Sequence, residues 1–224
     1  MARRIKEDPG VHRMRIADAA GKLFEAKGTE NTSVSEIARA AGYSKATLYV
    51  YFKNKEEIIA YLVLSSMKML KDCIFSALSG KKDYRDRYFD ICHAMVSYQE
   101  KYPYYFSIVL DYINIDFDNS GCEESERETF MVGEEINSML FSFINDGIKD
   151  GAFRKQSNVK SVIMTIWGML SGLIQLASNK EQYILQEIRL SRKAFLDKGF
   201  QFLYGAIENT SADKEHKSDK NKKK

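Results

Sequence analysis

Apolar residues near the start of the chain recur with the period of an α-helix. Between Val11 and Lys27 they stand at positions i, i+3, i+4, i+7 and i+8, as Ile16, Ala19, Ala20, Leu23 and Phe24. Such a stripe forms one face of an amphipathic helix. Gly28 follows directly, and glycine is common just after the C-terminus of a helix. We therefore predict a first helix over residues 11–27.

Two much shorter helices are predicted next, joined by a turn that contains glycine. Ser33 and Glu36 have the spacing of a capping box, in which a hydroxyl and a carboxylate bond the free N–H groups of a helix start. This helix would end at Gly42, and Ser44 can cap the following one. A longer helix followed by two short helices and a tight turn is typical of a helix-turn-helix unit.

The remainder of the chain has the pattern of longer helices. Asn54 and Glu57 can cap a fourth helix that continues towards Leu78. Others are predicted over residues 83–101, 104–115, 127–149, 159–178 and 189–208. A break is expected before Pro103, since the residue before proline disfavours helical geometry. The chain has only two prolines and no sustained apolar/polar alternation, so we predict an all-α fold.

The composition is that of a folded protein from a reducing compartment. Of the 224 residues, 44% are hydrophobic and 12% aromatic, which argues against global disorder. The three cysteines show no CxxC spacing, so neither a disulfide framework nor a zinc site is indicated. The N-terminus lacks the apolar region of a secretion signal. The most apolar run, residues 162–177, is shorter than the ~20 residues of a membrane span. We predict a cytoplasmic location.

Charge is distributed unevenly along the chain. The net charge is +3, yet residues 1–55 carry 11 Lys/Arg against 6 Asp/Glu, whereas residues 56–212 carry 17 against 22. The last segment, residues 213–224, carries 6 against 3. A basic N-terminal part on a mildly acidic body is an indication of polyanion binding.

Enzymatic chemistry is not indicated. His12, His93 and His216 are far apart in the sequence, and neither an HExxH nor a GxSxG motif occurs. Cys92 and His93 are adjacent, so their side chains diverge on a helix. We predict a protein without catalytic residues, metal or cofactor.

The stretch GYSKATLYVYFKNKEEI, residues 42–58, carries three tyrosines and three lysines. Leu48 and Phe52 lie together on a helical wheel and would face a core. Thr47 and Tyr51 form an i, i+4 pair that would point outward. A short helix anchored by two apolar residues would then hold hydroxyls and amines towards its surroundings.

That outward surface suits a DNA duplex. Tyrosine and threonine hydroxyls can donate to phosphate oxygens, and lysine neutralises charge. Ala46, opposite the core, would let the helix enter the ~12 Å major groove, where Lys45 could bond guanine. Lys55 and Ser33 stand at helix starts, whose free N–H groups bind anions. The alternative is that the tyrosines are half-buried aromatics and the lysines an ordinary solvated face.

The segments IADAAGKLFEAKG and TSVSEIARAAGYSKATLYVYFKNKEEI, within residues 15–62, resemble the N-terminal DNA-binding domain of TetR-family transcriptional regulators. The resemblance implies contacts with bases or the adjacent backbone for Lys45, Ala46, Thr47 and Tyr49. It implies phosphate contacts for Ser33, Tyr51 and Lys55. Ser33 stands where the family commonly has threonine, and Tyr51 where histidine is frequent, which would keep the phosphate contact without a titratable group.

The resemblance also implies a homodimer, in which the two C-terminal helices of each copy form a four-helix bundle. The sequence permits this, since Gly168 and Gly172 would let helices approach closely and the helix over 159–178 is apolar over a wide arc. Burial of that helix within one subunit is the alternative. A palindromic operator requires two DNA-binding units, which favours the dimer.

The middle of the chain is rich in aromatic residues and methionines, a composition that can line an apolar ligand pocket. Candidate ligand-binding residues are His93, Tyr98, Tyr105, Asn137, Trp167 and Gln175. Ordinary core packing is the alternative for each of them. The expected partner is a small, largely hydrophobic effector whose binding weakens DNA binding.

These observations predict three domains. Residues 1–58 would form the helix-turn-helix DNA-binding domain, residues 59–208 a helical ligand-binding and dimerisation domain, and residues 209–224 a disordered lysine-rich tail. The predicted function is that of a repressor that binds a palindromic DNA operator as a dimer and is released by its ligand. The alternative is a ligand-independent DNA-binding structural protein.

Overall fold

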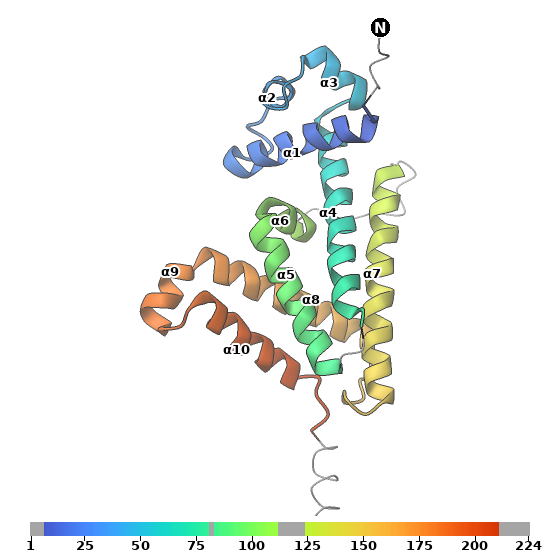
Figure 1. Ribbon diagram of the computed structural model, residues 1–224, viewed down its shortest axis with the longest axis vertical. Helices are drawn as coiled ribbons and strands as arrows, with labels where there is room; N and C mark the ends of the chain where they lie inside the picture. Colours follow the sequence, from blue (N-terminus) through green and yellow to red (C-terminus); the bar gives the residue numbers. More distant parts are fainter. Residues whose placement is uncertain (1–6, 81–82, 112–123, 211–224) are drawn as a thin grey trace, which may run out of the picture. The chain divides into compact units, whose positions relative to one another are not determined.

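The computed structural model describes residues 7–80, 83–111 and 124–210. Every regular element in these ranges is helical, which confirms the predicted all-α fold (Figure 1). The helices are α1 (Pro9–Lys27), α2 (Val34–Ala40), α3 (Lys45–Tyr51), α4 (Lys55–Leu78), α5 (Tyr84–Lys101), α6 (Pro103–Asp111), α7 (Glu124–Lys149), α8 (Val159–Asn179), α9 (Glu181–Tyr183), a π-helix η1 (Ile184–Ile188) and α10 (Arg192–Gly205).

The chain divides into two compact units. Unit 1 comprises Met1–Met69 and Gln99–Val132, and unit 2 comprises Leu70–Tyr98 and Gly133–Lys224. The helices α4, α5 and α7 contribute residues to both units. The functional domain boundaries expected after residues 58 and 208 stay a prediction.

In unit 1, α1 contacts α2, α3 and α6. In its apolar stripe, Ile16 and Ala20 are fully buried and Phe24 nearly so, whereas Ala19 and Leu23 are half-buried. Ile37 of α2 and Leu48 of α3 are likewise fully buried in this unit. The predicted helix-turn-helix therefore has its core where the hydrophobic pattern placed it, and α1 supports both short helices.

The starts of the short helices follow the sequence signals. Ser33 and Glu36 form the complete capping box of α2, and the Ser44 hydroxyl accepts a hydrogen bond from the Thr47 backbone N–H. Gly42, in the turn between α2 and α3, has a φ of 76°. Any residue with a Cβ would be strained in this left-handed conformation, so the glycine permits the tight turn.

In unit 2, α8 contacts α10. Ile174 and Ala177 of α8 and Phe200 of α10 are fully buried. At the end of α7, Gly147 leaves room for the ring of Phe153, because a Cβ at this position would collide with the ring. Phe153 is fixed further by its backbone N–H, which donates to the Gly147 carbonyl at 2.9 Å.

The C-terminal region differs from its prediction in one respect. A single helix was expected over residues 189–208, whereas α10 begins at Arg192 and the preceding residues form α9 and η1. Arg189 has a left-handed φ of 58°, which ends η1, and Ser191 caps α10. Residues 112–115 of the predicted sixth helix and the tail from residue 211 lie outside the described residues.

Candidate nucleic-acid interface

Helix α3 separates its side chains into a buried and an exposed set. Leu48 is 0% exposed, whereas Val50 is 77% exposed on the opposite side. Lys45 and Ala46 are exposed, as is Tyr49 at 47%. The Lys45 ammonium lies 5.9 Å from the centre of the Tyr49 ring. The outermost surface of α3 thus offers an amine, a phenol and two small apolar groups.

Thr47 and Tyr51, which the helical wheel predicted to point outward, are half-buried. Thr47 is held at the helix start, where its hydroxyl lies 2.8 Å from the Ser44 hydroxyl. Tyr51 is partly covered because its ring stacks on the His12 ring, with centroids 5.0 Å apart. Both side chains are therefore oriented by neighbours before any ligand arrives.

An aromatic cluster joins the first turns of α1 to α3. The His12 Nδ1 atom lies 2.6 Å from the Tyr43 hydroxyl. The Arg15 Nη1 group donates to the same hydroxyl at 2.9 Å. Glu7 faces the other side of the imidazole, with Oε2 3.6 Å from Nε2. His12, Arg15 and Tyr43 were not predicted from the sequence as parts of this surface.

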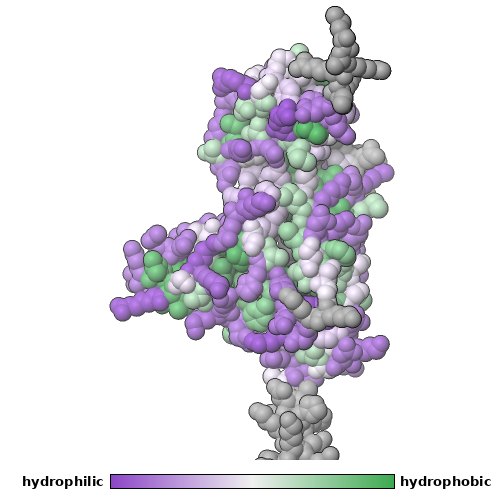
Figure 2. Space-filling view, viewed as in Figure 1, coloured by the Kyte–Doolittle hydropathy of each residue, from purple (hydrophilic) through white to green (hydrophobic). Residues whose placement is uncertain are grey.

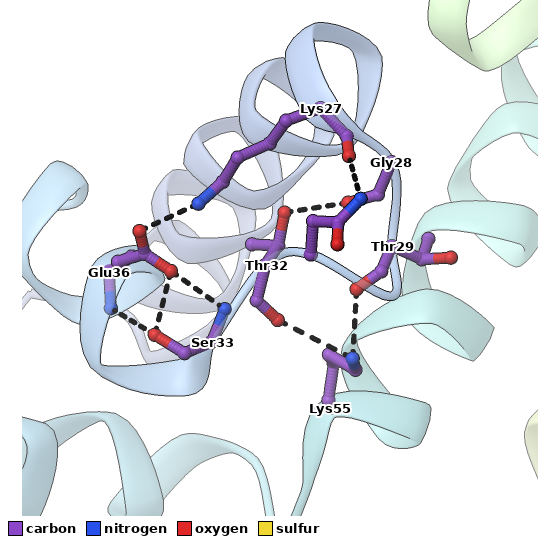
Figure 3. Close-up of polar contacts among 8 residues, drawn as sticks. Lys27, Gly28, Thr29, Thr32, Ser33, Glu36 and Lys55 are labelled. Carbon is purple, nitrogen blue, oxygen red and sulfur yellow. Dashed lines mark hydrogen bonds and ion pairs between the residues drawn. The ribbon is translucent and has the colours of Figure 1, made fainter.

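Ser33 is exposed at the start of α2, but its hydroxyl is already bonded within the protein (Figure 3). It donates to Glu36 Oε2 at 2.8 Å and accepts from the Glu36 backbone N–H at 3.3 Å. Lys27 Nζ lies 2.6 Å from Glu36 Oε1. These contacts lower the pKa of Glu36 to about 2. The hydrogen bond from the Lys27 ammonium has the largest effect, and the bonds from the Ser33 backbone N–H and hydroxyl come next. The carboxylate is therefore charged and compensated at neutral pH.

Lys55, the first residue of α4, reaches back to the turn between α1 and α2 (Figure 3). Its Nζ donates to the Thr29 carbonyl at 2.8 Å and to the Thr32 carbonyl at 3.4 Å. An ammonium has three N–H groups, so one remains for another acceptor. Lys55 thus ties α4 to the α1–α2 turn, and its predicted phosphate contact stays a prediction.

Another cation, Arg13 of α1, is held by neighbours within unit 1. Its guanidinium lies 4.5 Å from the centre of the Phe52 ring and pairs with Glu57 Oε1 at 3.2 Å. Glu57 in turn accepts from the Lys53 backbone N–H at 2.6 Å. This arrangement stabilises the turn between α3 and α4 and contributes no free cation to the exposed face of α3.

The six candidate ligand-binding residues do not gather around one cavity. An apolar cavity of about 50 Å³ lies in unit 2, and Trp167 is the candidate that lines it. Its full lining is Ile74, Tyr88, Ile91, Met95, Leu140, Phe143, Ile144, Ile163, Ile166, Trp167, Leu170 and Ile207.

The other five candidates are elsewhere. His93 is exposed and pairs with Asp197 Oδ1 at 3.1 Å. Tyr98 is buried, and the Tyr105 hydroxyl donates a hydrogen bond to Asp18. Asn137 lines a groove beside α8, and Gln175 forms a hydrogen bond with Asn179. Their ligand contacts stay a prediction.

Cys92 directly follows the cavity-lining residue Ile91 and is fully buried. Burial raises the pKa of its thiol to about 12, so the reactive thiolate is not populated near neutral pH. Among the described residues, no group of three or more His, Cys, Asp or Glu side chains could hold a metal ion. The buried cysteine therefore acts as a small apolar residue.

Helix α8 is long and apolar enough to cross a membrane by length and composition, the one such helix in the described part of the chain. Only 28% of the most apolar 18-residue stretch of this helix is buried. One helix of this kind is weak evidence for a membrane span. Its exposed apolar positions are equally those of a helix that packs against another protein surface.

Residues 16–62, which extend from α1 into α4, match the family model described as bacterial regulatory proteins, tetR family. Among curated proteins, an HTH-type transcriptional regulator of Staphylococcus aureus (strain USA300) is 33% identical over 75 residues. The match covers 30% of this chain and 40% of that protein, so it spans about two fifths of the relative's length.

Solved structures extend the similarity to most of the chain. PfmR, a TetR family transcriptional regulator from Thermus thermophilus, is 26% identical with a TM-score of 0.65, over 85% of this chain and 97% of that chain. FadR, the fatty acid degradation regulator from Bacillus halodurans, has a TM-score of 0.67 over 89% of this chain and 96% of that one. At 21% identity this second likeness shows the fold alone. The chain therefore carries the DNA-binding domain of the TetR family over residues 16–62, and its fold is similar to that of TetR-family transcriptional regulators.

Proposed function

We propose that the chain is a cytoplasmic repressor that binds a palindromic DNA operator as a homodimer and is released by a small hydrophobic ligand. The exposed face of α3 carries this proposal. Leu48 anchors the helix at 0% exposure, while Lys45, Ala46 and Tyr49 are held outward. A seven-residue helix with small residues on its outer face fits the major groove.

The DNA contacts divide by chemistry. Lys45 bonds the guanine edge, and the neighbouring side chains Ala46, Thr47 and Tyr49 touch bases or the adjacent backbone. Tyr51 donates its hydroxyl to a phosphate. Lys55 has one N–H left for a phosphate, and the Ser33 hydroxyl has an acceptor site left that can bind water next to one. The contacts with bases set the sequence preference, and the contacts with phosphates set the affinity for any duplex.

Dimerisation through α8 and α10 is supported by the apolar surface of unit 2. Met164 and Met169 on α8 are 59% and 52% exposed, and Phe202 on α10 is 81% exposed. Figure 2 shows apolar surface around α9 and the adjacent parts of α8 and α10. Gly168 and Gly172 have open space where a Cβ would stand. An exposed apolar patch of this kind marks a protein–protein contact, and two copies supply the two units that a palindrome needs.

The apolar cavity of unit 2 is the proposed ligand site. Its volume of about 50 Å³ is far below the roughly 300–1,000 Å³ of ligand pockets, so a ligand must displace side chains to enter. Ile74 of α4 is one lining residue. Helix α4 is continuous from Lys55 to Leu78, so a displacement at Ile74 has a direct route along the helix to Lys55.

The small volume of this cavity also favours the alternative of a DNA-binding structural protein without a ligand. The two functions differ in their response to small molecules. Mass spectrometry of the purified protein identifies co-bound molecules, which are then added to the protein–DNA complex. A repressor of the proposed kind loses affinity for its operator, whereas unchanged affinity with every bound molecule supports the alternative.

The DNA-binding proposal is tested by selecting duplexes from a random pool with the full-length protein. We expect a two-fold symmetric site, bound by two copies of the chain, with affinity that falls as salt increases. The stoichiometry is measured by sedimentation of the complex. Failure to enrich any duplex sequence would contradict the operator proposal. An asymmetric site bound by a single copy would contradict the dimer.

A further inference from the structure

His12, Tyr43 and Tyr51 form one hydrogen-bonded and stacked cluster, although they come from α1, the α2–α3 turn and α3. The His12 ring is 5.0 Å from the Tyr51 ring at an interplanar angle of 29°, and it meets the Tyr43 ring edge-on at 5.8 Å. The His12 side chain is only 18% exposed. An imidazole, the side chain that changes charge between pH 5 and 8, therefore touches a proposed DNA-contacting tyrosine.

The hydrogen bonds of the Tyr43 hydroxyl depend on the charge of His12. Arg15 always donates to this oxygen, because a guanidinium stays protonated. When His12 is neutral with its proton on Nε2, Nδ1 accepts the hydroxyl proton of Tyr43 over 2.6 Å. When His12 is protonated, Nδ1 donates to the oxygen instead. The Tyr43 oxygen then has two donors, and its own proton is free to point at an external acceptor.

We infer that Tyr43 extends the DNA-binding surface as a second phosphate-binding hydroxyl and that His12 is its positioning residue, with protonation of His12 strengthening the contact. The inference rests on the proposed function, since the ligand is the DNA backbone. The imidazolium adds a positive charge beside Tyr51, and it stacks more strongly on that ring as a cation. Both changes favour a phosphate at this point of the surface.

The charged and titratable groups around His12 act in the same direction. Glu7, before α1, lies 3.6 Å from Nε2 and pairs with the imidazolium. Arg15 of α1 lies 3.5 Å from Glu7 Oε1, so this carboxylate is shared between two cations when His12 is charged. Among the described residues, Tyr43 and Tyr51 also contact His12. With His12 protonated, the cluster carries one more positive charge than with His12 neutral.

The test is the affinity for a duplex that the wild-type protein selects from a random pool, measured at about pH 6 and about pH 8 at fixed salt. We expect wild-type affinity to be about three- to tenfold higher at the lower pH, the size of one typical hydrogen bond. His12→Gln should remove this pH response. Tyr43→Phe should also remove most of it while keeping the ring, which separates the hydroxyl from packing.

The matched control is His93→Gln, since His93 is an exposed histidine of unit 2 that pairs with Asp197. This variant should keep the wild-type pH response. Thermal unfolding of each variant verifies that it is folded at both pH values. An unchanged pH response in folded His12→Gln would overturn the inference while leaving the proposed function intact. A wild-type protein that selects no duplex would overturn both.

Discussion

Helix α3 of unit 1 and helices α8 and α10 of unit 2 differ in the large side chains that they expose. On unit 1, α3 buries Leu48 completely and leaves the polar Lys45 and Tyr49 outside. On unit 2, α8 and α10 leave Met169 52% and Phe202 81% exposed. The polar surface is well hydrated and can exchange its water for an anion. Contact between the apolar surface and water is unfavourable, so this surface is stabilised when a second apolar surface covers it.

The two units also differ in how their surfaces are held. Around α2 and α3, hydrogen bonds fix the side chains that we propose to contact DNA, as with Ser44 and Thr47 at 2.8 Å or Lys55 and the Thr29 carbonyl at 2.8 Å. The exposed part of α8 instead carries flexible methionines and glycines. A fixed polar surface suits a regular duplex, whereas an adaptable apolar surface suits close packing of helices. The difference predicts that damage to each surface has a separate readout.

The largest effect is expected from Phe202→Asp in unit 2. Burying a phenylalanine stabilises an interface by about 1.5–3 kcal/mol, so the two copies in a symmetric dimer would lose roughly 3–6 kcal/mol. We expect a monomer in sedimentation experiments at concentrations where the wild type is a dimer. Phe75→Asp is the control, since Phe75 is also exposed, at 61%, but lies on α4. Monomers from both variants alike would show that exposure, not the α8–α10 surface, decides assembly.

The core of unit 1 is probed by Leu48→Ala. Truncating a fully buried leucine costs about 2–5 kcal/mol of unfolding free energy, and α3 would lose its anchor. Chemical denaturation measures the loss, and DNA affinity should fall with it. Val50→Ala is the matched control, because Val50 is 77% exposed on the same helix and its truncation should change stability by less than ~0.5 kcal/mol. Equal losses in the two variants would contradict the assigned faces of α3.

The polar face of α3 is tested by the specificity of DNA binding. Lys45→Ala should reduce discrimination at one base pair by about 1–3 kcal/mol. Tyr51→Phe removes the hydroxyl of the proposed phosphate contact and should weaken binding to all sequences alike. Lys22→Ala, at an exposed lysine of α1, serves as the control. Competition between selected and point-mutated duplexes distinguishes these results, and a uniform loss in Lys45→Ala would contradict its role in base recognition.

Local signals made the helix-turn-helix predictable. The two residues of each helix cap are three positions apart, so their spacing is visible in the sequence. The pairs are Ser33 and Glu36, Ser44 and Thr47, and Asn54 and Glu57. The stacked pair of His12 and Tyr51 and the tie from Lys55 to Thr29 join residues far apart in the chain. Contacts of this kind depend on how the helices pack, which periodicity does not specify.

Because periodicity does not specify helix packing, the sequence also did not predict which of the candidate ligand-binding residues line the cavity. Polar and aromatic residues in the middle of the chain predicted a pocket, but the cavity is lined by residues of α4, α5, α7, α8 and the segment after α10. Trp167 faces this cavity, whereas His93 lies at an exposed ion pair. Both are aromatic rings on helices, and only the packing of those helices distinguishes them.

The smallest effect concerns acid stability of unit 1. The pKa of Glu36 is lowered from 4.5 to about 2 in the folded protein, chiefly by Lys27 and then by Ser33. A group with a depressed folded pKa stabilises the fold fully above its unfolded pKa, and this contribution is lost as the pH falls through the folded pKa. Glu36→Gln should therefore lower stability at neutral pH and flatten its decline between about pH 4.5 and 2. The control Glu25→Gln alters an exposed glutamate of α1. An identical acid profile in both variants would show that the Lys27–Glu36–Ser33 contacts do not hold α2 to α1, and the fixed polar surface of unit 1 would need another source of its rigidity.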